Sequence, residues 1–210
     1  MSPAPTPARA VVIGGGVSGW NATQIAVGLG FHVTLLDRDI NKLREADKIF
    51  GTKVKTVVSN AFELEKAVVE ADLVIGAVLI PGAKAPKLVT NELVAKMKPG
   101  SVLVDIAIDQ GGCFEDSRPT THAEPTFLVH DSVFYCVANM PGAVPNTSTY
   151  ALTNATLPYI VELANRGWAD ALRRDAALAK GLNTHEGQVV YREVAEAHGL
   201  PHVELSTLLG

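Results

Sequence analysis

The sequence contains few cysteines, no long apolar run and little excess charge. Cys113 and Cys136 are too few for a disulfide framework and lack the Cys-x-x-Cys spacing of a redox or metal pair, so we expect reduced thiols in the core or a loop. The longest strongly apolar stretch, residues 73–80, is too short to span a bilayer. The net charge of −4 indicates no basic face. We therefore predict no metal site, no membrane partner and no nucleic-acid partner.

The N-terminus also lacks the basic start, apolar core and cleavage site of a secretory signal, so a cytoplasmic protein is expected. The 210 residues, of which 47% are hydrophobic and 19% charged, have the composition of a globular protein with room for one domain and an appendage. Residues 1–7 contain three prolines and are interpreted as a leader or linker.

The most informative stretch is a glycine-rich turn that follows the apolar run Val11–Ile13, which is typical of a buried parallel strand. Gly14, Gly16 and Gly19 have the Gly-x-Gly-x-x-Gly spacing: the first turns tightly, the second admits a phosphate, and the third lets a helix lie close to the strand. The N–H groups at the start of that helix would face an anion. The residues predicted to contact a dinucleotide pyrophosphate are Gly14, Gly16, Val17, Ser18 and Gly19.

A second strand, residues 32–36, ends at an acidic residue that indicates which dinucleotide is bound. The helix between the glycine turn and this strand is expected to bury one face, which is made of Ala22, Ile25, Ala26 and Leu29. Asp37 lies 18 residues after Gly19 (37 − 19 = 18), near the offset of the acid that binds the adenosine ribose. Its carboxylate would accept hydrogen bonds from ribose hydroxyls and repel a 2′-phosphate, which favours NAD(H) over NADP(H). The neighbouring Arg38 leaves that preference less than absolute.

Beyond this unit, strands and helices continue to alternate, which predicts an α/β fold with a doubly wound parallel sheet of the Rossmann type. Further strands are expected at residues 53–58, 73–78, 101–106 and 133–137. From residue 147 the pattern becomes helical, with a bend at Pro158, an end at Gly167, helices over 168–179 and 188–198, and an irregular tail. We therefore predict a dinucleotide-binding domain at residues 8–145 and a helical segment at 146–210.

Two loops at the carboxyl ends of these strands are candidates for the rest of the site. Val78 ends the expected strand at residues 73–78, and Leu79 begins the small, proline-rich loop up to Pro86, which could lie against a flat ring or be an ordinary connection. Ile106 ends the next expected strand. If that strand continues, Asp105 and Asp109 share one side of it, and Asp109 meets cofactor and substrate. The alternative interpretation of either acid is a loop cap or a surface acid.

Asn139 and Met140 leave the carboxyl end of the expected strand at residues 133–137. The amide of Asn139 could bind a carboxamide or carboxylate, and the side chain of Met140 could pack on a ring. Turn chemistry and core packing are the alternative interpretations of these two residues.

The sequence resembles the NAD-binding part of bacterial alanine dehydrogenases, which are relatives of the proton-translocating transhydrogenase α subunit. The resemblance extends from about Ala8 to the C-terminus and is most specific at residues 12–17, 104–112 and 137–145. It implies a Rossmann fold, NAD as cofactor, self-association, and the reaction of L-alanine, NAD and water to pyruvate, ammonium and NADH. It also implies that Asp37 binds the ribose, that Asp109 assists proton transfer, and that Asn139 and Met140 lie beside nicotinamide and substrate. The sequence departs from the family at Asn146, where an arginine is expected.

A larger departure concerns the substrate site. The family places its substrate-binding arginine and lysine and its catalytic histidine upstream of the glycine turn, where this sequence has residues 1–9. We therefore expect a cofactor domain that binds NAD(H) but is inactive, or nearly so, alone, with L-alanine or pyruvate as partners only if the missing segment is supplied. The alternatives are an NAD(H)-binding module of a divided transhydrogenase-like complex and a non-catalytic scaffold.

Overall fold

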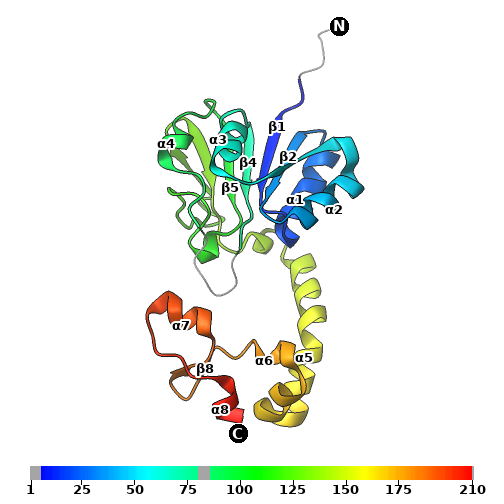
Figure 1. Cartoon of the computed structure of the whole chain (residues 1–210), viewed down its shortest axis with the longest axis vertical. Coiled ribbons are helices and arrows are strands. Elements are labelled where there is room, and N and C mark those ends of the chain that lie inside the picture. The colour runs from blue at the N-terminus through cyan, green and yellow to red at the C-terminus, as the bar shows by residue number, and fades with distance from the viewer. Residues whose placement is uncertain (1–5, 80–85, 210) are drawn as a thin grey trace. The chain divides into compact units, whose positions relative to one another are not determined.

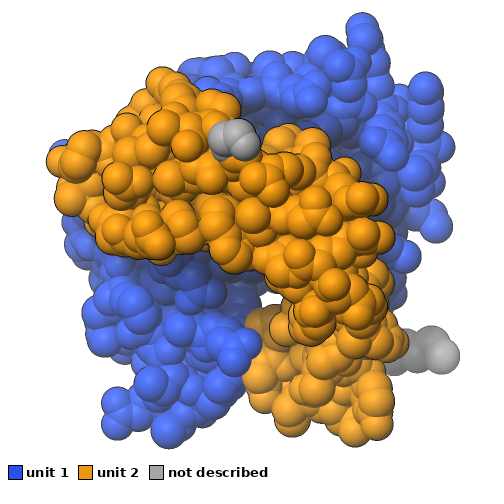
Figure 2. All heavy atoms as spheres, turned by 90° about the horizontal axis from the view of Figure 1, so that it is seen from below, with its two compact units in different colours: residues 1–80, 84–140 blue, residues 81–83, 141–210 orange. Residues whose placement is uncertain are grey.

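The computed structural model describes residues 6–79 and 86–209. These residues form two compact units, one ending at residue 140 and the other continuing from residue 141 (Figure 2). Residues 1–5 of the predicted leader and residues 80–85 of the predicted ring-facing loop lie outside the described residues. The domain boundary predicted after residue 145 stays a prediction.

The first unit is built on a seven-stranded sheet with the order β3-β2-β1-β4-β5-β7-β6 (Figure 1). All neighbouring strands are parallel except β6 and β7. The strands are β1 (Arg9–Ile13), β2 (His32–Asp37), β3 (Val54–Val58), β4 (Leu73–Gly76), β5 (Val102–Asp105), β6 (Thr126–Val129) and β7 (Ser132–Tyr135). The predicted doubly wound α/β fold is confirmed. Strand order reverses beside β1, which lies between β2 and β4, and this is where such sheets form a crevice at their carboxyl edge.

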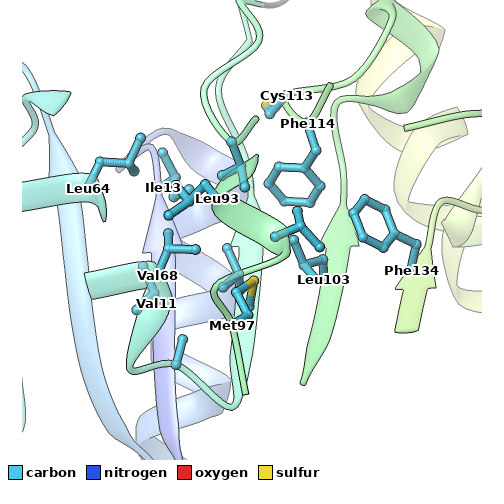
Figure 3. Close-up of a cluster of buried hydrophobic side chains, with 14 of the residues drawn as sticks. Val11, Ile13, Leu64, Val68, Leu93, Met97, Leu103, Cys113, Phe114 and Phe134 are labelled. Atoms are coloured by element: carbon cyan, nitrogen blue, oxygen red, sulfur yellow. The ribbon is translucent and has the colours of Figure 1, made fainter. Parts of the chain in front are cut away.

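Helices cover both faces of this sheet. Alternate residues of each strand point to opposite sides, so each strand contacts helices on both faces. Ala10 and Val12 of β1 pack in a cluster with side chains of α1 (Val17–Gly28) and α2 (Ile40–Phe50). Val11 and Ile13 pack in a second cluster with side chains of α3 (Ala61–Val69) and α4 (Asn91–Val94), as Figure 3 shows. The central strand β1 is thus buried on both faces.

The buried face of α1 differs from the prediction. Gly19, Thr23 and Ala26 are the buried residues of this helix, whereas Ile25 is 64% and Leu29 is 72% exposed. Gly19 contacts the preceding turn so closely that its own face of the helix must lie against the sheet. Residues four and seven positions later share that face. Of the predicted face, Ala26 is buried and Ala22 packs partly buried against the core, whereas the placement of Ile25 and Leu29 was wrong.

The strands β4 and β5 end earlier than predicted, and the chain then turns sharply. β5 stops at Asp105, and residues Ile108–Gln110 form the short 3-10 helix η2. The expected alternation that would place Asp105 and Asp109 on one side of a continued strand therefore does not occur. The antiparallel edge strand β6 was not predicted. It pairs with β7 as a hairpin whose turn includes His130 at φ 51°.

The second unit is mostly helical. Its long helix α5 (Pro145–Arg174) is interrupted by non-helical backbone at Gly167 (φ 73°), where the sequence predicted a helix end. Next come α6 (Ala176–Ala179), a hairpin of β8 (Thr184–His185) and β9 (Gln188–Val189), α7 (Arg192–His198) and α8 (Leu205–Leu209). The helix predicted from residue 188 thus begins only at Arg192, and the tail predicted to be irregular contains α8.

Short 3-10 turns complete the described structure: η1 (Gly51–Lys53) follows α2, and η3 (Met140–Ala143) precedes α5. Across residues 6–79 and 86–209, no helix is both long and apolar enough to cross a bilayer.

Candidate functional site

A cavity of about 510 Å³ opens at the carboxyl edge of the sheet, against the ends of β1, β2 and β4. This is the crevice that the reversal of strand order creates. The predicted site residues that line it are Gly14, Gly16, Val17, Ser18, Asp37, Val78 and Leu79. The structure therefore brings together residues that are up to 65 positions apart in the sequence (79 − 14 = 65).

Two glycines of the turn are required by close packing. Gly14 has φ +103°, and a Cβ atom there would lie 2.8 Å from the carbonyl oxygen of Ala77. A Cβ atom on Gly19 would lie 1.8 Å from the carbonyl oxygen of Gly14. Any side chain at either position would displace backbone, so these two residues fix the turn against β4 and the start of α1 against the turn.

Gly16 has a different role in the same turn. It is the N-cap of α1, and no side chain of the described residues caps the helix there. Apart from its two chain neighbours, no described residue has an atom within 4 Å of the position its Cβ would take, and Gly16, Val17 and Ser18 line the cavity. The first turn of α1 therefore presents backbone N–H groups and the positive end of the helix dipole beside open space, which suits an anion such as a pyrophosphate.

Asp37, the last residue of β2, lies beside this turn. Its Oδ2 accepts a hydrogen bond from the Gly15 N–H at 2.7 Å, its Oδ1 accepts one from the Asp39 N–H at 2.8 Å, and the Lys42 ammonium lies 3.5 Å from Oδ2. Burial raises the pKa of the Asp37 carboxyl, but the N–H groups of Asp39 and Gly15 and the charge of Lys42 outweigh that effect, so the pKa lies below its ordinary value. The group is a carboxylate at neutral pH.

Sequence reasoning missed several residues that line the cavity. Lys42, in the first turn of α2, and Ser59, directly after β3, both belong to the lining, as do Leu88 and Arg38. Arg38, which the sequence analysis considered only for its effect on the preference for NAD(H), lies beside Asp37 in this lining. The position of Ser59 after a parallel strand was the available signal, because every strand of such a sheet presents its carboxyl end to the same edge.

Five predicted site residues do not line the cavity. One of them is Gly19, which packs against the carbonyl oxygen of Gly14. Ile106 follows β5 and packs partly buried against the α1 and α2 side of the core. Asp109 lies exposed in η2. Asn139 is exposed with φ 56°, and its carbonyl oxygen lies 3.1 Å from Nε2 of His122. Met140 begins η3 and is partly buried. The contacts with nicotinamide and substrate that were predicted for the other four stay predictions.

Asp105, by contrast, is fully buried. Its carboxylate accepts hydrogen bonds from the N–H groups of Ala107 (3.1 Å), Cys113 (2.8 Å) and Phe114 (3.3 Å), and from the hydroxyl of Ser117. This matches the loop cap that the sequence offered as an alternative.

Both cysteines are buried free thiols, as predicted. Burial, with the charge of Asp105 as a second cause, raises the pKa of Cys113 to about 12. Its thiol therefore stays protonated at neutral pH and is not a nucleophile. Within residues 6–79 and 86–209, no group of three or more His, Cys, Asp or Glu side chains could hold a metal ion.

Comparison with known proteins agrees with this geometry. Residues 2–192 match the family model described as "Alanine dehydrogenase/PNT, C-terminal domain". The chain is 62% identical over 207 residues to the alanine dehydrogenases of Mycolicibacterium smegmatis and Mycobacterium tuberculosis, which covers 99% of this chain and 56% of each relative.

Solved structures show the same relationship. An L-alanine dehydrogenase superposes with a TM-score of 0.82 at 50% identity, covering 92% of this chain and 54% of that one. A transhydrogenase from Sinorhizobium meliloti superposes with a TM-score of 0.69 at 27% identity, covering 89% and 51%. The chain thus spans about half the length of the relatives that it matches. It belongs to the alanine dehydrogenase/PNT family and corresponds to the C-terminal domain of that family.

Proposed function

We propose that this chain binds NAD(H) as the cofactor domain of an L-alanine dehydrogenase, which converts L-alanine, NAD and water to pyruvate, ammonium and NADH. The identity of 62% to alanine dehydrogenases over nearly the whole chain supports the reaction. Since the chain covers 56% of those relatives, the complete activity is proposed for the enzyme and cofactor binding for this chain.

The observation that carries the proposal is the pairing of an uncapped helix start with an ionised carboxylate in one cavity. The N–H groups at Gly16, Val17 and Ser18 would hold the pyrophosphate. Asp37 would accept hydrogen bonds from the adenosine ribose hydroxyls, and Lys42 would donate one to the same sugar. A 2′-phosphate would meet the charge of Asp37, so NAD(H) is favoured over NADP(H), although Arg38 also lines the cavity.

For the reaction, the bound nicotinamide supplies the hydride acceptor. Asp109, exposed after β5, is proposed to assist proton transfer, because a carboxylate there is free of the buried network that holds Asp105. The amide of Asn139 is proposed to orient the carboxamide or the substrate carboxylate, and Met140 to pack against the ring. The two buried free thiols suit the reducing cytoplasmic setting that we propose.

The test is a titration of the purified chain with NADH by fluorescence, followed by addition of pyruvate and ammonium. We expect saturable binding that Asp37→Ala weakens about tenfold or more, since a charge-assisted hydrogen bond is lost. Asp72→Ala is the matched control: Asp72 also accepts a backbone N–H (Arg9, 2.8 Å) but does not line the cavity. Unchanged affinity in Asp37→Ala would contradict the ribose assignment. Consumption of NADH would show that this chain also carries substrate-binding groups.

A second candidate is an NAD(H)-binding module that serves a partner chain in a divided transhydrogenase-like complex. The superposition on the Sinorhizobium meliloti transhydrogenase supports it, although the identity of 27% is lower than the 50% to the L-alanine dehydrogenase. This module would bind NADH without consuming it when pyruvate, ammonium and the N-terminal part of an alanine dehydrogenase are supplied together.

Self-association is also proposed. The helix α5 exposes large apolar side chains along its length, which suits burial against another surface. The most exposed of these are Tyr150, Leu152, Leu157 and Ile160. Light scattering coupled to gel filtration would test this, and a monomer at all concentrations would contradict it.

A further inference from the structure

A buried carboxylate organises the loop that follows β5. The four donors to Asp105 come from residues 107, 113, 114 and 117, so one side chain holds both ends of an eleven-residue loop (117 − 107 + 1 = 11). Gly112 has φ +78°, and a Cβ atom on it would lie 2.6 Å from Oδ2 of Asp105. The loop is therefore folded tightly around the carboxylate.

The same loop contacts the wall of the cavity. The Sγ atom of Cys113 lies 3.5 Å from the carbonyl oxygen of Val78, and the N–H of Leu88 donates to the carbonyl oxygen of Cys113 at 2.7 Å. Val78 and Leu88 both line the cavity. The ring of the adjacent Phe114 is fully buried and meets Phe134 edge-on at 5.9 Å between centroids, which anchors the loop in the core (Figure 3).

Lys87 adds a second attachment between the loop and this wall. Its ammonium donates to the carbonyl oxygen of Phe114 at 2.8 Å and also to that of Gly111. The N–H of Glu115 donates in turn to the carbonyl oxygen of Val89 at 2.9 Å. Hydrogen bonds thus connect residues 87–89 to residues 111–115, and the N–H groups of Cys113 and Phe114 connect the same segment to Asp105.

We propose that Asp105 is a positioning residue for the nicotinamide half of the cofactor, acting through the Cys113 contact with Val78 and through the placement of Asp109. This inference rests on the proposed NAD(H) site. The adenosine half is assigned to β1 and β2, where the glycine turn and Asp37 lie, so the nicotinamide half faces the ends of β4 and β5. Asp105 does not line the cavity, and its effect on the cofactor is transmitted by the loop.

The experiment compares NADH with ADP-ribose, which has the adenosine and pyrophosphate but lacks the nicotinamide, on the full chain. Asp105→Asn keeps the size of the side chain but turns one acceptor oxygen into an NH₂ group that faces backbone N–H donors. We expect the Kd for NADH to rise about tenfold while the Kd for ADP-ribose changes less than about twofold. Ser132→Ala is the control, because it removes a buried hydroxyl contact (Ser101, 2.8 Å) outside the loop.

The outcomes separate the two proposals. Equal weakening of both ligands in a folded variant, or no weakening of either, would overturn the positioning role while leaving the NAD(H) site intact. If the unaltered chain binds neither ligand, the proposed function itself fails and this inference fails with it. Should Asp105→Asn not fold, Ser117→Ala removes one of the four donors. It is expected to show the same selective loss for NADH at about threefold, and an equal effect on both ligands would overturn the inference.

Discussion

Asp37 and Asp105 have the same local backbone structure but different surroundings in the fold. Each is the last residue of a parallel strand, and each accepts a hydrogen bond from the N–H two residues later, on Asp39 and Ala107 respectively. A carboxylate has about four lone-pair sites. Asp105 receives four donors and is fully buried, whereas Asp37 receives two N–H groups and one distant ammonium and lines the cavity.

The difference shows that a strand-end acid becomes a candidate ligand only when the fold leaves part of its acceptor capacity free. For Asp37 the long-range backbone donor is the Gly15 N–H, and the residue still lines the cavity. For Asp105 the loop up to Ser117 closes over both oxygens. Two acids that look alike in sequence therefore divide into one that lines the cavity and one that holds a loop.

The largest expected effect is on stability. Asp105→Ala leaves three backbone N–H groups and a hydroxyl without an acceptor in a dry interior, and should lower the free energy of unfolding by about 4 kcal/mol. Asp37→Ala should cost about 1 kcal/mol, since water from the cavity can reach its donors. Urea unfolding measures both. Equal costs would show that the two carboxylates are equivalent and would break the comparison.

The glycine turn provides the same contrast between a packed and a cavity-facing position. Gly19→Ala forces a Cβ atom onto the Gly14 carbonyl and should destabilise the fold by about 3 kcal/mol. Gly16→Ala should leave unfolding within about 0.5 kcal/mol, because φ is −73° and the space is open. It should nevertheless weaken NADH binding, because the added methyl group occupies the approach to the N–H groups. A stable Gly19→Ala variant would contradict the assigned packing.

A smaller effect is expected on pH dependence. The pKa of Asp37 is lowered in the folded state, so its contribution to stability is present above the ordinary carboxyl pKa and is lost as the pH falls through the folded value. The difference in unfolding free energy between the unaltered chain and Asp37→Asn should be constant from neutral pH to about pH 5 and shrink below about pH 4. A difference that grows on acidification would mean that the pKa is raised.

The smallest effect is expected at Asp109. This acid is exposed, so Asp109→Asn should change unfolding by less than about 0.5 kcal/mol and the Kd for ADP-ribose by less than about twofold. Thermal unfolding and the ligand titration used for Asp105→Asn measure both quantities. A strong loss of stability would place Asp109 in the buried network and remove its contrast with Asp105.

The sequence predicted the region around Asp37 well because its requirements are local. Gly19 is dictated by a contact within one strand-turn-helix unit and Gly14 by the positive φ of the same turn, and the strands on either side are rich in apolar residues. One local prediction nevertheless failed. Rotation of α1 toward Thr23 rather than Ile25 depends on the approach of Gly19 to Gly14, and two apolar stripes were compatible with the same residues.

The region around Asp105 could not be predicted in the same way. Alternation along residues 104–109 assumes a continuing strand, but the donors from Cys113, Phe114 and Ser117 turn the chain back instead. Lys42, Ser59 and Leu88 reach the cavity from three different elements, and only the assembled sheet brings them together. The sequence of the edge strand β6 shows no clear alternation of polar and apolar residues. Its side chains are exposed or partly buried because the strand lies at the end of the sheet.

The central place of β1 has a consequence for how the site forms in time. β1 pairs with β4, and the paired residues are 63 positions apart, as in Ala10 and Leu73 (73 − 10 = 63). The N–H of Ala77 also donates a hydrogen bond to the carbonyl oxygen of Ile13. Closing a loop of that length costs conformational entropy before any contact compensates for it, so such pairings form late in folding. A nascent chain that has emerged only as far as β3 carries the glycine turn and Asp37 but no opposite wall. Binding of the proposed cofactor would therefore report that the two halves of the sheet have joined.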